Sequence, residues 1–323
     1  MATIGIRFDL RIPPGSASTH ADAYRACLEM CTWADEHGAD LVVLSEHHGV
    51  DDGYLPSPVT LAAAVAARTS RLMINIAALL VPLHDPVRLA EQLAVASLVS
   101  GGRVSFVAGL GYRPEEFEMA GVERRQRGRL MEEYVRVLRQ AWTGEPFEWR
   151  GRTIRVTPAP AVPPPILVGG STEKAARRAA RLQAGFFPAV GDQRLADVYE
   201  EECRAQGFAG GFVMLPGGPG FVHVSDDPER DWQRIGPHAL YDAQTYAAWQ
   251  TPDQRSSMHV EARTIDDVRR SDAYKVLTPD ETVRLAEETG RVILHPLMGG
   301  MAPELGWESL RLFQEKVLPR IRA

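Results

Sequence analysis

Short runs of apolar and β-branched residues alternate along the chain with longer stretches whose apolar positions repeat at the spacing of an amphipathic helix. The runs predict eight strands. Their expected ranges are 3–10, 39–45, 72–81, 104–109, 166–169, 185–190, either 212–215 or 221–224, and 291–295. Alternation of strands with helices favours a parallel sheet. Eight repeats in one chain predict a (β/α)8 TIM barrel of the α/β class, with insertions at its C-terminal face.

Local signals mark the ends of several predicted helices. Thr19 and Asp85 are placed as N-caps, and Gly101 as a residue that ends a helix. Residues 278–281 (Thr-Pro-Asp-Glu) have the form of a capping box. An open doubly wound sheet is the alternative fold, but it usually carries a glycine-rich turn after the first strand. Residues 8–14 read Phe-Asp-Leu-Arg-Ile-Pro-Pro, which favours the barrel.

Two stretches depart from a plain barrel. Residues 147–156 predict a small hairpin outside it, and a proline-rich segment at 158–165 leads into the fifth strand. Residues 226–274 form a longer polar segment with scattered aromatics, interpreted as a helix plus an excursion that covers the barrel mouth. The expected organisation is one domain over residues 1–323.

The charge balance narrows the classes of partner. The 323 residues include 36 Lys and Arg against 42 Asp and Glu, a formal net charge of −6. A basic field that attracts nucleic acid or anionic lipid is therefore not expected, and small molecules are the expected partners. No apolar run approaches a membrane span, and the start lacks the pattern of an export signal, so we expect a cytoplasmic protein. Cys27, Cys31 and Cys203 are expected to be buried small side chains.

In a barrel, the loops after the strands build the site, and the second predicted strand ends in Ser45-Glu46-His47-His48. A glutamate with two histidines can be a metal site, a catalytic base with its orienting partner, or a structural network in the barrel wall. Adjacent histidines on extended backbone point to opposite faces, and no third ligand is evident nearby, which disfavours a metal. The place at the mouth and the titration of histidine near neutral pH favour catalysis.

Several motifs occur in a fixed order along the chain. They are Glu46-His47-His48, residues 77–82 (Ala-Ala-Leu-Leu-Val-Pro), 84–88 (His-Asp-Pro-Val-Arg), 102–104 (Gly-Arg-Val), 109–112 (Gly-Leu-Gly-Tyr), 168–171 (Val-Gly-Gly-Ser), 296–300 (Pro-Leu-Met-Gly-Gly) and 317–319 (Val-Leu-Pro). In this order and spacing the chain resembles the bacterial luciferase-like monooxygenases, from Ile4 to about Pro188 and again at its C-terminal end. The family includes flavin-dependent and F420-dependent oxidoreductases.

The resemblance implies that His47 lies beside the reactive edge of a flavin, where it stabilises an oxygen adduct or relays protons during oxygen transfer. Glu46 and His48 would support it from behind. The resemblance also implies a non-proline cis peptide at Ala77-Ala78, beneath the isoalloxazine ring. Small residues packed in a barrel wall are the simpler interpretation of the two alanines.

Gly169, Gly170, Ser171 and Thr172 lie between the fifth strand and a helix expected at 173–181. Free amides and hydroxyls converge there at the positive end of a helix, which suits the phosphate of a cofactor. A turn of this composition can also be a helix cap alone.

Gly109, Leu110, Gly111 and Tyr112, after the fourth strand, allow close approach of the backbone to the cofactor. This loop departs from the luciferases proper, because Leu110 stands where they bring an arginine to the phosphate; Arg113 is a candidate replacement. F420-dependent members share the barrel and vary in this loop, so the departure leaves the cofactor open.

Three residues are candidates for substrate contact: His238 and Tyr241 in the covering segment, and His295 at the end of the eighth strand. Surface or capping roles are the alternative for His238 and Tyr241, and packing in the barrel wall is the alternative for His295.

The leading hypothesis is a monooxygenase that takes reduced FMN from a separate flavin reductase and uses O2 to oxidise a small organic substrate. No nicotinamide fingerprint is visible. The alternatives are an F420-dependent oxidoreductase that transfers hydride directly, a non-catalytic flavin-binding protein, and a metal-dependent barrel hydrolase that uses Glu46, His47 and His48. The hydrolase predicts a bound metal, and we expect none. The resemblance also implies a homodimer formed through helices near the second and third strands.

Overall fold

The computed structural model describes residues 2–16, 18–250 and 256–322. Nine parallel strands form one sheet in the order β10-β9-β11-β1-β2-β3-β4-β7-β8. Their bounds are β1 Thr3–Phe8, β2 Leu41–Leu44, β3 Met73–Leu79, β4 Val104–Ala108, β7 Ile166–Gly170, β8 Gly185–Pro188, β9 Phe221–Val224, β10 Tyr274–Leu277 and β11 Arg291–Leu294. The α/β class with a parallel sheet is therefore as predicted.

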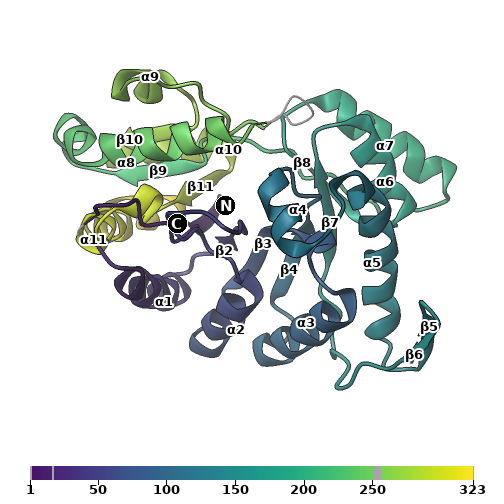
Figure 1. Cartoon of the computed structure of the whole chain (residues 1–323). Coiled ribbons are helices and arrows are strands. Elements are labelled where there is room, and N and C mark those ends of the chain that lie inside the picture. The colour runs from purple at the N-terminus through teal and green to yellow at the C-terminus, as the bar shows by residue number, and fades with distance from the viewer. Residues whose placement is uncertain (1, 17, 251–255, 323) are drawn as a thin grey trace.

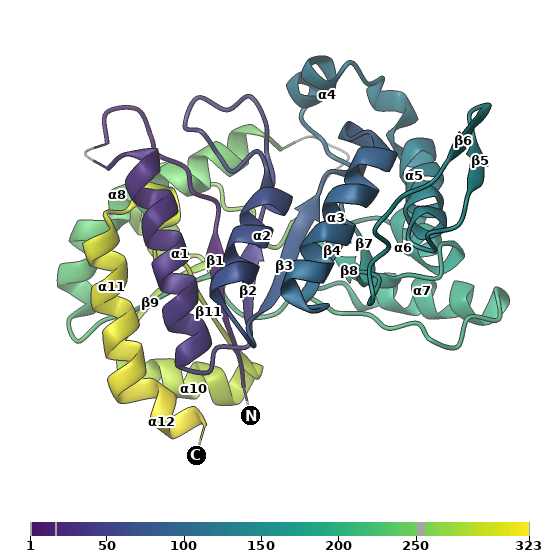
Figure 2. The ribbon, with the colours of Figure 1, turned by 90° about the horizontal axis from the view of Figure 1, so that it is seen from below.

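Helices surround the strands (Figure 1). They are α1 His20–Glu36, α2 Pro58–Arg68, α3 Pro86–Ser100, α4 Pro114–Ala120, α5 Arg127–Ala141, α6 Glu173–Arg181, α7 Gln193–Ala205, α8 Pro228–Ala248, α9 Ile265–Arg270, α10 Pro279–Thr289, α11 Pro303–Leu312 and α12 Leu318–Ile321, with the 3-10 turns η1 Val81–Leu83, η2 Arg124–Gln126 and η3 Met298–Gly300 and the π-helix η4 Phe313–Val317. Figure 2 shows α1, α2 and α3 side by side over the strands, with both chain ends at the same end of the molecule.

The strand predictions agree with the structure to within a few residues, with two corrections. The seventh predicted strand is β9, and residues 212–215 contribute an isolated bridge between Phe186 and Val213. β10, at the C-terminal edge of the segment 226–274, is a ninth strand beyond the eight expected. Within that segment the structure contains α8 and α9, while residues 251–255 lie outside the described residues.

β8 and β10 are the two ends of the sheet, and no backbone ladder joins them in the described part of the chain. A hydrogen bond from the backbone N–H of Ser257 to the carbonyl of Ala189 (2.8 Å) links the segment before α9 to the end of β8. The fold therefore brings the far ends of the sheet together through a loop.

The predicted local signals are confirmed. Thr19 accepts a hydrogen bond from the backbone of Asp22 (3.2 Å), and the Asp85 carboxylate accepts two at the start of α3. Gly101 ends α3 with a left-handed φ of 65°, and the capping box at Thr278 is present. The hairpin is also confirmed: β5 (Phe147–Trp149) pairs antiparallel with β6 (Arg152–Ile154).

The two faces of the sheet differ in polarity. Ile6 of β1 is buried in the hydrophobic core, whereas the next residue, Arg7, lines a cavity inside the barrel. Nη2 of Arg7 lies 3.4 Å from Oγ of Ser45, and the Asn75 amide donates to Ser105 on the neighbouring strand (2.9 Å). The interior therefore has polar groups on β1, on β3 and β4, and just beyond β2, although the outer faces of these strands are apolar.

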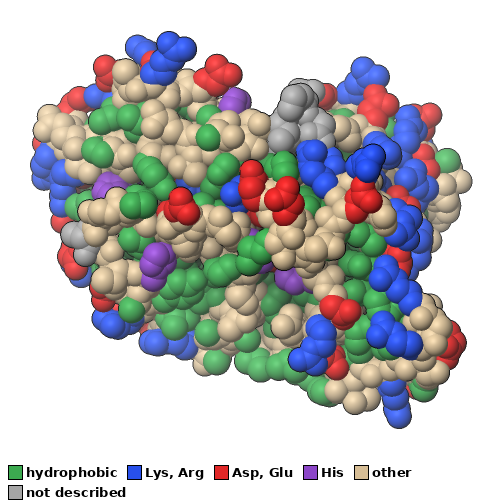
Figure 3. Space-filling view, viewed as in Figure 1, with side chains coloured by type: hydrophobic (Ala, Val, Ile, Leu, Met, Phe, Trp, Pro, Cys, Tyr) green, Lys and Arg blue, Asp and Glu red, His purple; other side chains and the backbone are tan. Residues whose placement is uncertain are grey.

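On the face seen in Figure 3, basic and acidic side chains are interspersed. Among the described helices, none combines the length and the hydropathy that a membrane crossing requires.

Candidate functional site

His47 follows β2 and is held on both ring nitrogens. Its Nδ1 lies 2.8 Å from Oε1 of Glu116, a buried residue of α4, and its Nε2 lies 3.2 Å from the hydroxyl of Tyr112 in the loop after β4. The same Oε1 accepts the backbone N–H of His48 (3.0 Å). We call His47, Tyr112 and Glu116 the His47 cluster.

The acceptors assign the tautomer of His47. A carboxylate only accepts hydrogen bonds, so the ring proton is on Nδ1, and Nε2 accepts from the Tyr112 hydroxyl. Burial lowers the pKa of His47, and the hydrogen bond to Glu116 offsets only part of that shift. His47 is therefore a neutral imidazole whose Nε2 can take up a proton.

Aromatic rings enclose the His47 imidazole. Its ring centroid lies 4.8 Å from that of Tyr54, 4.8 Å from that of Trp249 and 5.4 Å from that of Tyr112. Trp249 directly follows α8, so the helix predicted in the segment 226–274 brings a side chain to the mouth. These rings account for the desolvation of His47.

Glu46, the residue before His47, contacts two other histidines, His48 and His84. Its Oε1 lies 2.9 Å from Nε2 of His48 and 2.8 Å from Nε2 of His84, and its Oε2 accepts the backbone N–H of Leu80 (2.5 Å). The ligand atoms of Glu46, His48 and His84 lie within 4.8 Å of one another. The expectation that no third ligand lies nearby is therefore wrong, because β3 and η1 bring His84 to Glu46 and His48. The contact of His84 with Glu46 has the geometry of a hydrogen bond.

Glu46 and His48 lie at ion-pair distance, 2.9 Å, and each shifts the pKa of the other. Burial alone would raise the pKa of Glu46, but the hydrogen bonds and charges of His48 and His84 lower it to about 2. For His48, burial lowers the pKa, and the bond to Glu46 more than reverses this, so the net shift is upward. The two adjacent histidines thus have pKa shifts of opposite sign.

The peptide bond between Ala77 and Ala78 in β3 is cis, which confirms that prediction. Ser45 donates to the carbonyl of Ala77 (3.0 Å). Gly109 lies directly beside the bond, where an added Cβ would come within 2.7 Å of the Ala78 Cβ. Glycine at 109 thus allows close approach here; the contact with a flavin stays a prediction.

Gly169 and Gly170 end β7, and Thr172 caps α6 by accepting from the backbone of Ala175 (3.3 Å). Gly170 has a φ of 148°, and a Cβ there would come within 2.5 Å of the Ala175 Cβ. The turn, which includes Ser171, therefore presents bare backbone at the positive end of a helix.

The loop after β4 is divided between core and site. Leu110 packs against the hydrophobic core, Gly111 has a φ of 74°, and Tyr112 reaches His47. Arg113 donates to the carbonyl of His48 (2.8 Å), and its guanidinium lies 4.7 Å from the ring of Trp249. Its expected role at the phosphate is not supported, because these contacts occupy it beside the His47 cluster.

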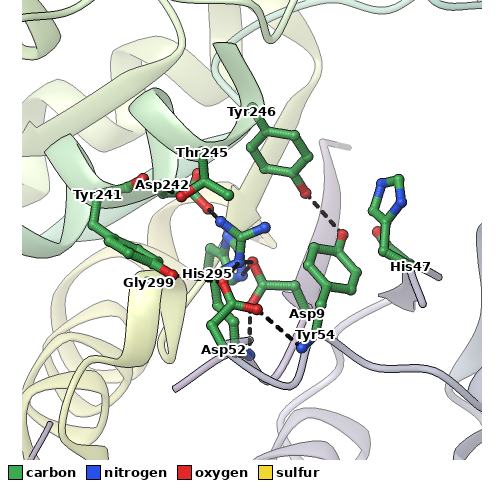
Figure 4. A network of polar contacts seen from close by, with 12 residues as sticks. Asp9, His47, Asp52, Tyr54, Tyr241, Asp242, Thr245, Tyr246, His295 and Gly299 are labelled. Atoms are coloured by element: carbon green, nitrogen blue, oxygen red, sulfur yellow. Dashed lines mark hydrogen bonds and ion pairs between the residues drawn. The ribbon is translucent and has the colours of Figure 1, made fainter. Parts of the chain in front are cut away.

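A second cluster surrounds the fully buried Arg11, which follows β1. Its Nε lies 3.6 Å from Oδ2 of Asp9 and 3.5 Å from Oδ2 of Asp52, and its Nη1 lies 3.2 Å from Oδ1 of Asp242. We call these four residues the Arg11 cluster. Figure 4 shows the three carboxylates on one side of Tyr54 and His47 on the other.

The three candidates for substrate contact have different surroundings. His238 binds the carbonyl of Gly299 through Nδ1 (2.9 Å), and Tyr241 donates to Oδ2 of Asp52 (2.9 Å). His295, 3.8 Å from Asp9, lines the interior cavity. The structure therefore places only His295, of these three, at that cavity.

The cavity has a volume of about 110 Å³, and Tyr112 of the His47 cluster lines it. Its lining residues include Arg7, Tyr112, Phe221, Tyr246, Tyr274 and His295. It therefore joins a charged interior, aromatic walls and the phenol that contacts His47.

Comparison with known protein families matches residues 6–290 to luciferase-like monooxygenase. The chain belongs to the luciferase-like monooxygenase family. It is 30% identical over 176 residues to the F420-dependent glucose-6-phosphate dehydrogenase of Nakamurella multipartita, an alignment of 50% of this chain and 51% of the relative. It is 37% identical over 137 residues to an uncharacterized protein of Mycobacterium tuberculosis, covering 41% and 47%. The chain spans about half the length of these relatives.

Solved structures resemble this family member over its whole length. A monooxygenase of Streptomyces bottropensis superimposes with a TM-score of 0.77 at 25% identity, covering 98% of this chain and 99% of that one. An FMN complex of the oxygenating constituent of 3,6-diketocamphane monooxygenase from Pseudomonas putida has a TM-score of 0.68 at 20% identity, covering 99% of each. An F420-dependent secondary alcohol dehydrogenase has a TM-score of 0.72 at 16% identity, covering 100% and 99%. The last two show the fold alone.

Sequence reasoning missed three groups in this luciferase-like site. Glu116 belongs to an acidic first helical turn, a pattern typical of solvated helix starts. His84 was part of a recognised motif, but its contact with Glu46 depends on the path of β3. The Arg11 cluster joins residues up to 233 positions apart, Asp9 and Asp242, which only the folded chain brings together.

Proposed function

We propose that this chain is a flavin-dependent monooxygenase that receives reduced FMN from a separate reductase and uses O2 to oxidise a small organic substrate. The observation that carries the proposal is the imidazole of His47, which is held on both ring nitrogens by Glu116 and by Tyr112, a residue that lines the interior cavity. Membership of the luciferase-like family and the likeness to a monooxygenase at 25% identity support it.

The residues at the mouth fit a phosphate-bearing cofactor. The amides of Gly170, Ser171 and Thr172 and the hydroxyl of Ser171, at the start of α6, would hold the phosphate, because the positive end of the helix dipole favours an anion. The bare backbone at Gly109 and the cis bond at Ala77 would face the ring. When bound, the reduced cofactor supplies electrons for the reaction with oxygen.

The chain's own residues would then position and move a proton. Glu116 keeps the proton of His47 on Nδ1, which leaves Nε2 free to accept one from a reacting group or from Tyr112. Tyr54 and Trp249 cover the imidazole and keep water from it. A low pKa for His47 means that it is unprotonated before the reaction begins.

An F420-dependent oxidoreductase is the second candidate, favoured by the identity with the F420-dependent dehydrogenase of Nakamurella multipartita. In that case hydride would pass directly between the deazaflavin and the substrate, without oxygen. Both cofactors carry a phosphate, so the turn at α6 suits either one.

The discriminating experiment loads the purified protein with FMN and with F420 in turn, removes the free cofactor and records the visible absorbance of what remains bound. We expect retention of FMN, and consumption of oxygen once the bound FMN is reduced. Retention of F420 alone, with anaerobic turnover, would replace the proposal by the second candidate. Retention of neither would reject both.

The phosphate assignment has its own control, because riboflavin lacks the phosphate. FMN should bind more tightly than riboflavin, and Ser171→Ala should narrow this difference by roughly tenfold, the value of a hydrogen bond to a charged group. Equal loss for both ligands would place the phosphate elsewhere.

A further inference from the structure

Arg7 is a cation inside the barrel with no described carboxylate at ion-pair distance. Among the described residues, its Nη2 has the hydroxyls of Ser45 and Tyr246 as partners, at 3.4 and 3.5 Å, and its Nε is buried without a hydrogen-bond partner. Ion pairs have N–O distances of at most 4.0 Å. Within the described ranges, no Asp or Glu oxygen lies that close to the guanidinium nitrogens of Arg7. Long contacts to neutral hydroxyls do not compensate a full positive charge.

The positive charge of Arg11, four residues further along the chain, is compensated by nearby carboxylates. Three carboxylates, those of Asp9, Asp52 and Asp242, lie within 3.6 Å of its guanidinium nitrogens. An arginine keeps its charge in a protein, and a charge removed from water is unfavourable unless it is paired. The carboxylates of Asp9 and Asp242 are thus in contact with Arg11, whereas they raise the pKa of Arg7 only from beyond ion-pair distance.

The charge of Arg7 faces the cavity of about 110 Å³. Phe221, Tyr246 and Tyr274 also line the cavity, and Tyr112 connects it to Nε2 of His47. Aromatic walls favour a flat, apolar group, because rings stack or meet edge to face with other rings. A cation at one wall and rings around it are the elements of a site for an organic anion.

Building on the proposed function, we propose that this cavity is the substrate site and takes a flat organic anion, a ring that carries a carboxylate or another ionised oxygen, and that Arg7 binds this oxygen. The planar guanidinium can donate two parallel hydrogen bonds to a carboxylate, a geometry that lysine does not offer. The ring of the substrate then lies among the aromatic walls, near Tyr112 and hence near His47. Arg7 is a binding residue in this account.

The other charged groups at the cavity are compatible with an anion. Burial raises the pKa of Asp242, which works against a second negative charge at this wall, and the phenol of Tyr274 donates to its Oδ2 (2.5 Å). Nδ1 of His259 is buried without a hydrogen-bond partner among the described residues, and Nε2 of His295 has only the longer contact of 3.8 Å with Asp9 among them, so both imidazoles can contribute polar contacts.

Calorimetric titration of cofactor-free protein with benzoate and with its neutral analogue benzamide tests the proposal. Benzoate should bind roughly tenfold or more tightly than benzamide, since hydrogen bonds to a charged group are the stronger class. Arg7→Met should remove this preference, and Arg88→Met, which changes an exposed arginine of α3, should keep it. Equal affinity for the two probes, or undiminished benzoate binding by Arg7→Met, would overturn the proposal.

A stability measurement separates binding from a structural role. Because no described carboxylate lies within ion-pair distance of Arg7, Arg7→Met should leave the melting temperature of the ligand-free protein unchanged or raised, and benzoate should raise it only in the unaltered protein. If Arg7→Met does not fold, Arg7 has a structural role and the proposal is overturned. Arg7→Lys keeps the charge but cannot donate two parallel hydrogen bonds, and it should bind benzoate with intermediate affinity.

The anion could also come from the reduced cofactor, and a parallel titration with reduced FMN distinguishes the two sources. We expect Arg7→Met to bind reduced FMN as the unaltered protein does. Weaker binding of reduced FMN with unchanged affinity for benzoate would assign Arg7 to the cofactor and reject the substrate site. Binding of benzoate by a protein that retains neither FMN nor F420 would instead reject the proposed function and leave the anion site standing.

Discussion

The Arg11 cluster and the His47 cluster are neighbours at the barrel mouth, and both contact the rings of Tyr54 and Trp249. The guanidinium of Arg11 lies 4.8 Å from the ring of Tyr54 and 5.2 Å from that of Trp249, and the imidazole of His47 lies 4.8 Å from each. In the Arg11 cluster the central guanidinium keeps its charge and has three carboxylates within 3.6 Å. In the His47 cluster the central group is neutral and its proton can move.

The comparison separates holding a site together from acting in it. Arg11 connects the end of β1, the loop after β2 and α8, three segments that are distant along the chain. Similar burial on the other side of Tyr54 lowers the pKa of His47 and keeps it neutral. The account therefore expects changes in the Arg11 cluster to alter stability first, and changes in the His47 cluster to alter reactivity first.

The largest expected effect is on turnover. His47→Ala removes the proton acceptor and should lower kcat by roughly 10²- to 10⁴-fold, the range of general acid–base catalysis, while the affinity for FMN stays within a small factor. The assay is steady-state turnover with the first substrate found by screening organic anions. His238→Ala is the matched control, because its imidazole binds Gly299. An unchanged rate in His47→Ala would move the proton transfer to another group.

The next effect is on folding. Arg11→Met leaves three buried carboxylates without their cation and should lower the free energy of unfolding by about 3–5 kcal/mol. Urea denaturation of the two proteins measures this, with Arg88→Met as an exposed control. If stability is unchanged, the Arg11 cluster does not hold these three segments together, and its structural role is rejected.

Acid dependence of stability should follow from Glu46. Its pKa falls from the ordinary 4.5 to about 2 in the folded protein, so its contribution is present above pH 4.5 and is lost as pH falls through about 2. The full contribution is about 3 kcal/mol, at about 1.4 kcal/mol per unit of pKa. Glu46→Gln should flatten this part of the curve of unfolding free energy against pH. A curve of the same slope in the variant would contradict the ion pair.

The smallest effects come from two matched substitutions, one in the His47 cluster and one at a residue that binds the Arg11 cluster. Tyr112→Phe removes the hydroxyl at Nε2 of His47 and should change kcat by up to roughly tenfold with little effect on stability. Tyr241→Phe removes the bond to Asp52 and should lower stability by about 1 kcal/mol with little effect on kcat. Measured together by kinetics and urea denaturation, the pair sharpens the comparison. Reversed outcomes would exchange the roles of the clusters.

The sequence predicts most of the scaffold because its signals are local. Capping residues such as Thr19 and Asp85, and apolar runs such as 166–169, depend on neighbours a few positions away. β10 was missed because its four residues come directly after a polar segment and have no long apolar run. Its pairing with β9 depends on a partner about 50 residues earlier in the chain.

The site is predictable in part for the same reason. The motif Glu46-His47-His48 indicates where chemistry is expected. The contacts that shift the pKa values of the two histidines in opposite directions are not all local in the sequence. Glu116 comes from α4 to His47, and Glu46 binds His48 within its own loop. Which histidine is neutral therefore depends on contacts that only the three-dimensional structure provides.

A crystal structure of the complex with FMN tests the central claim most directly. The account predicts that the flavin ring lies beside Nε2 of His47 and over the cis bond at Ala77, with the phosphate against the amides of Gly170, Ser171 and Thr172. A ring bound outside this mouth, or an imidazole of His47 turned away from it, would contradict the account.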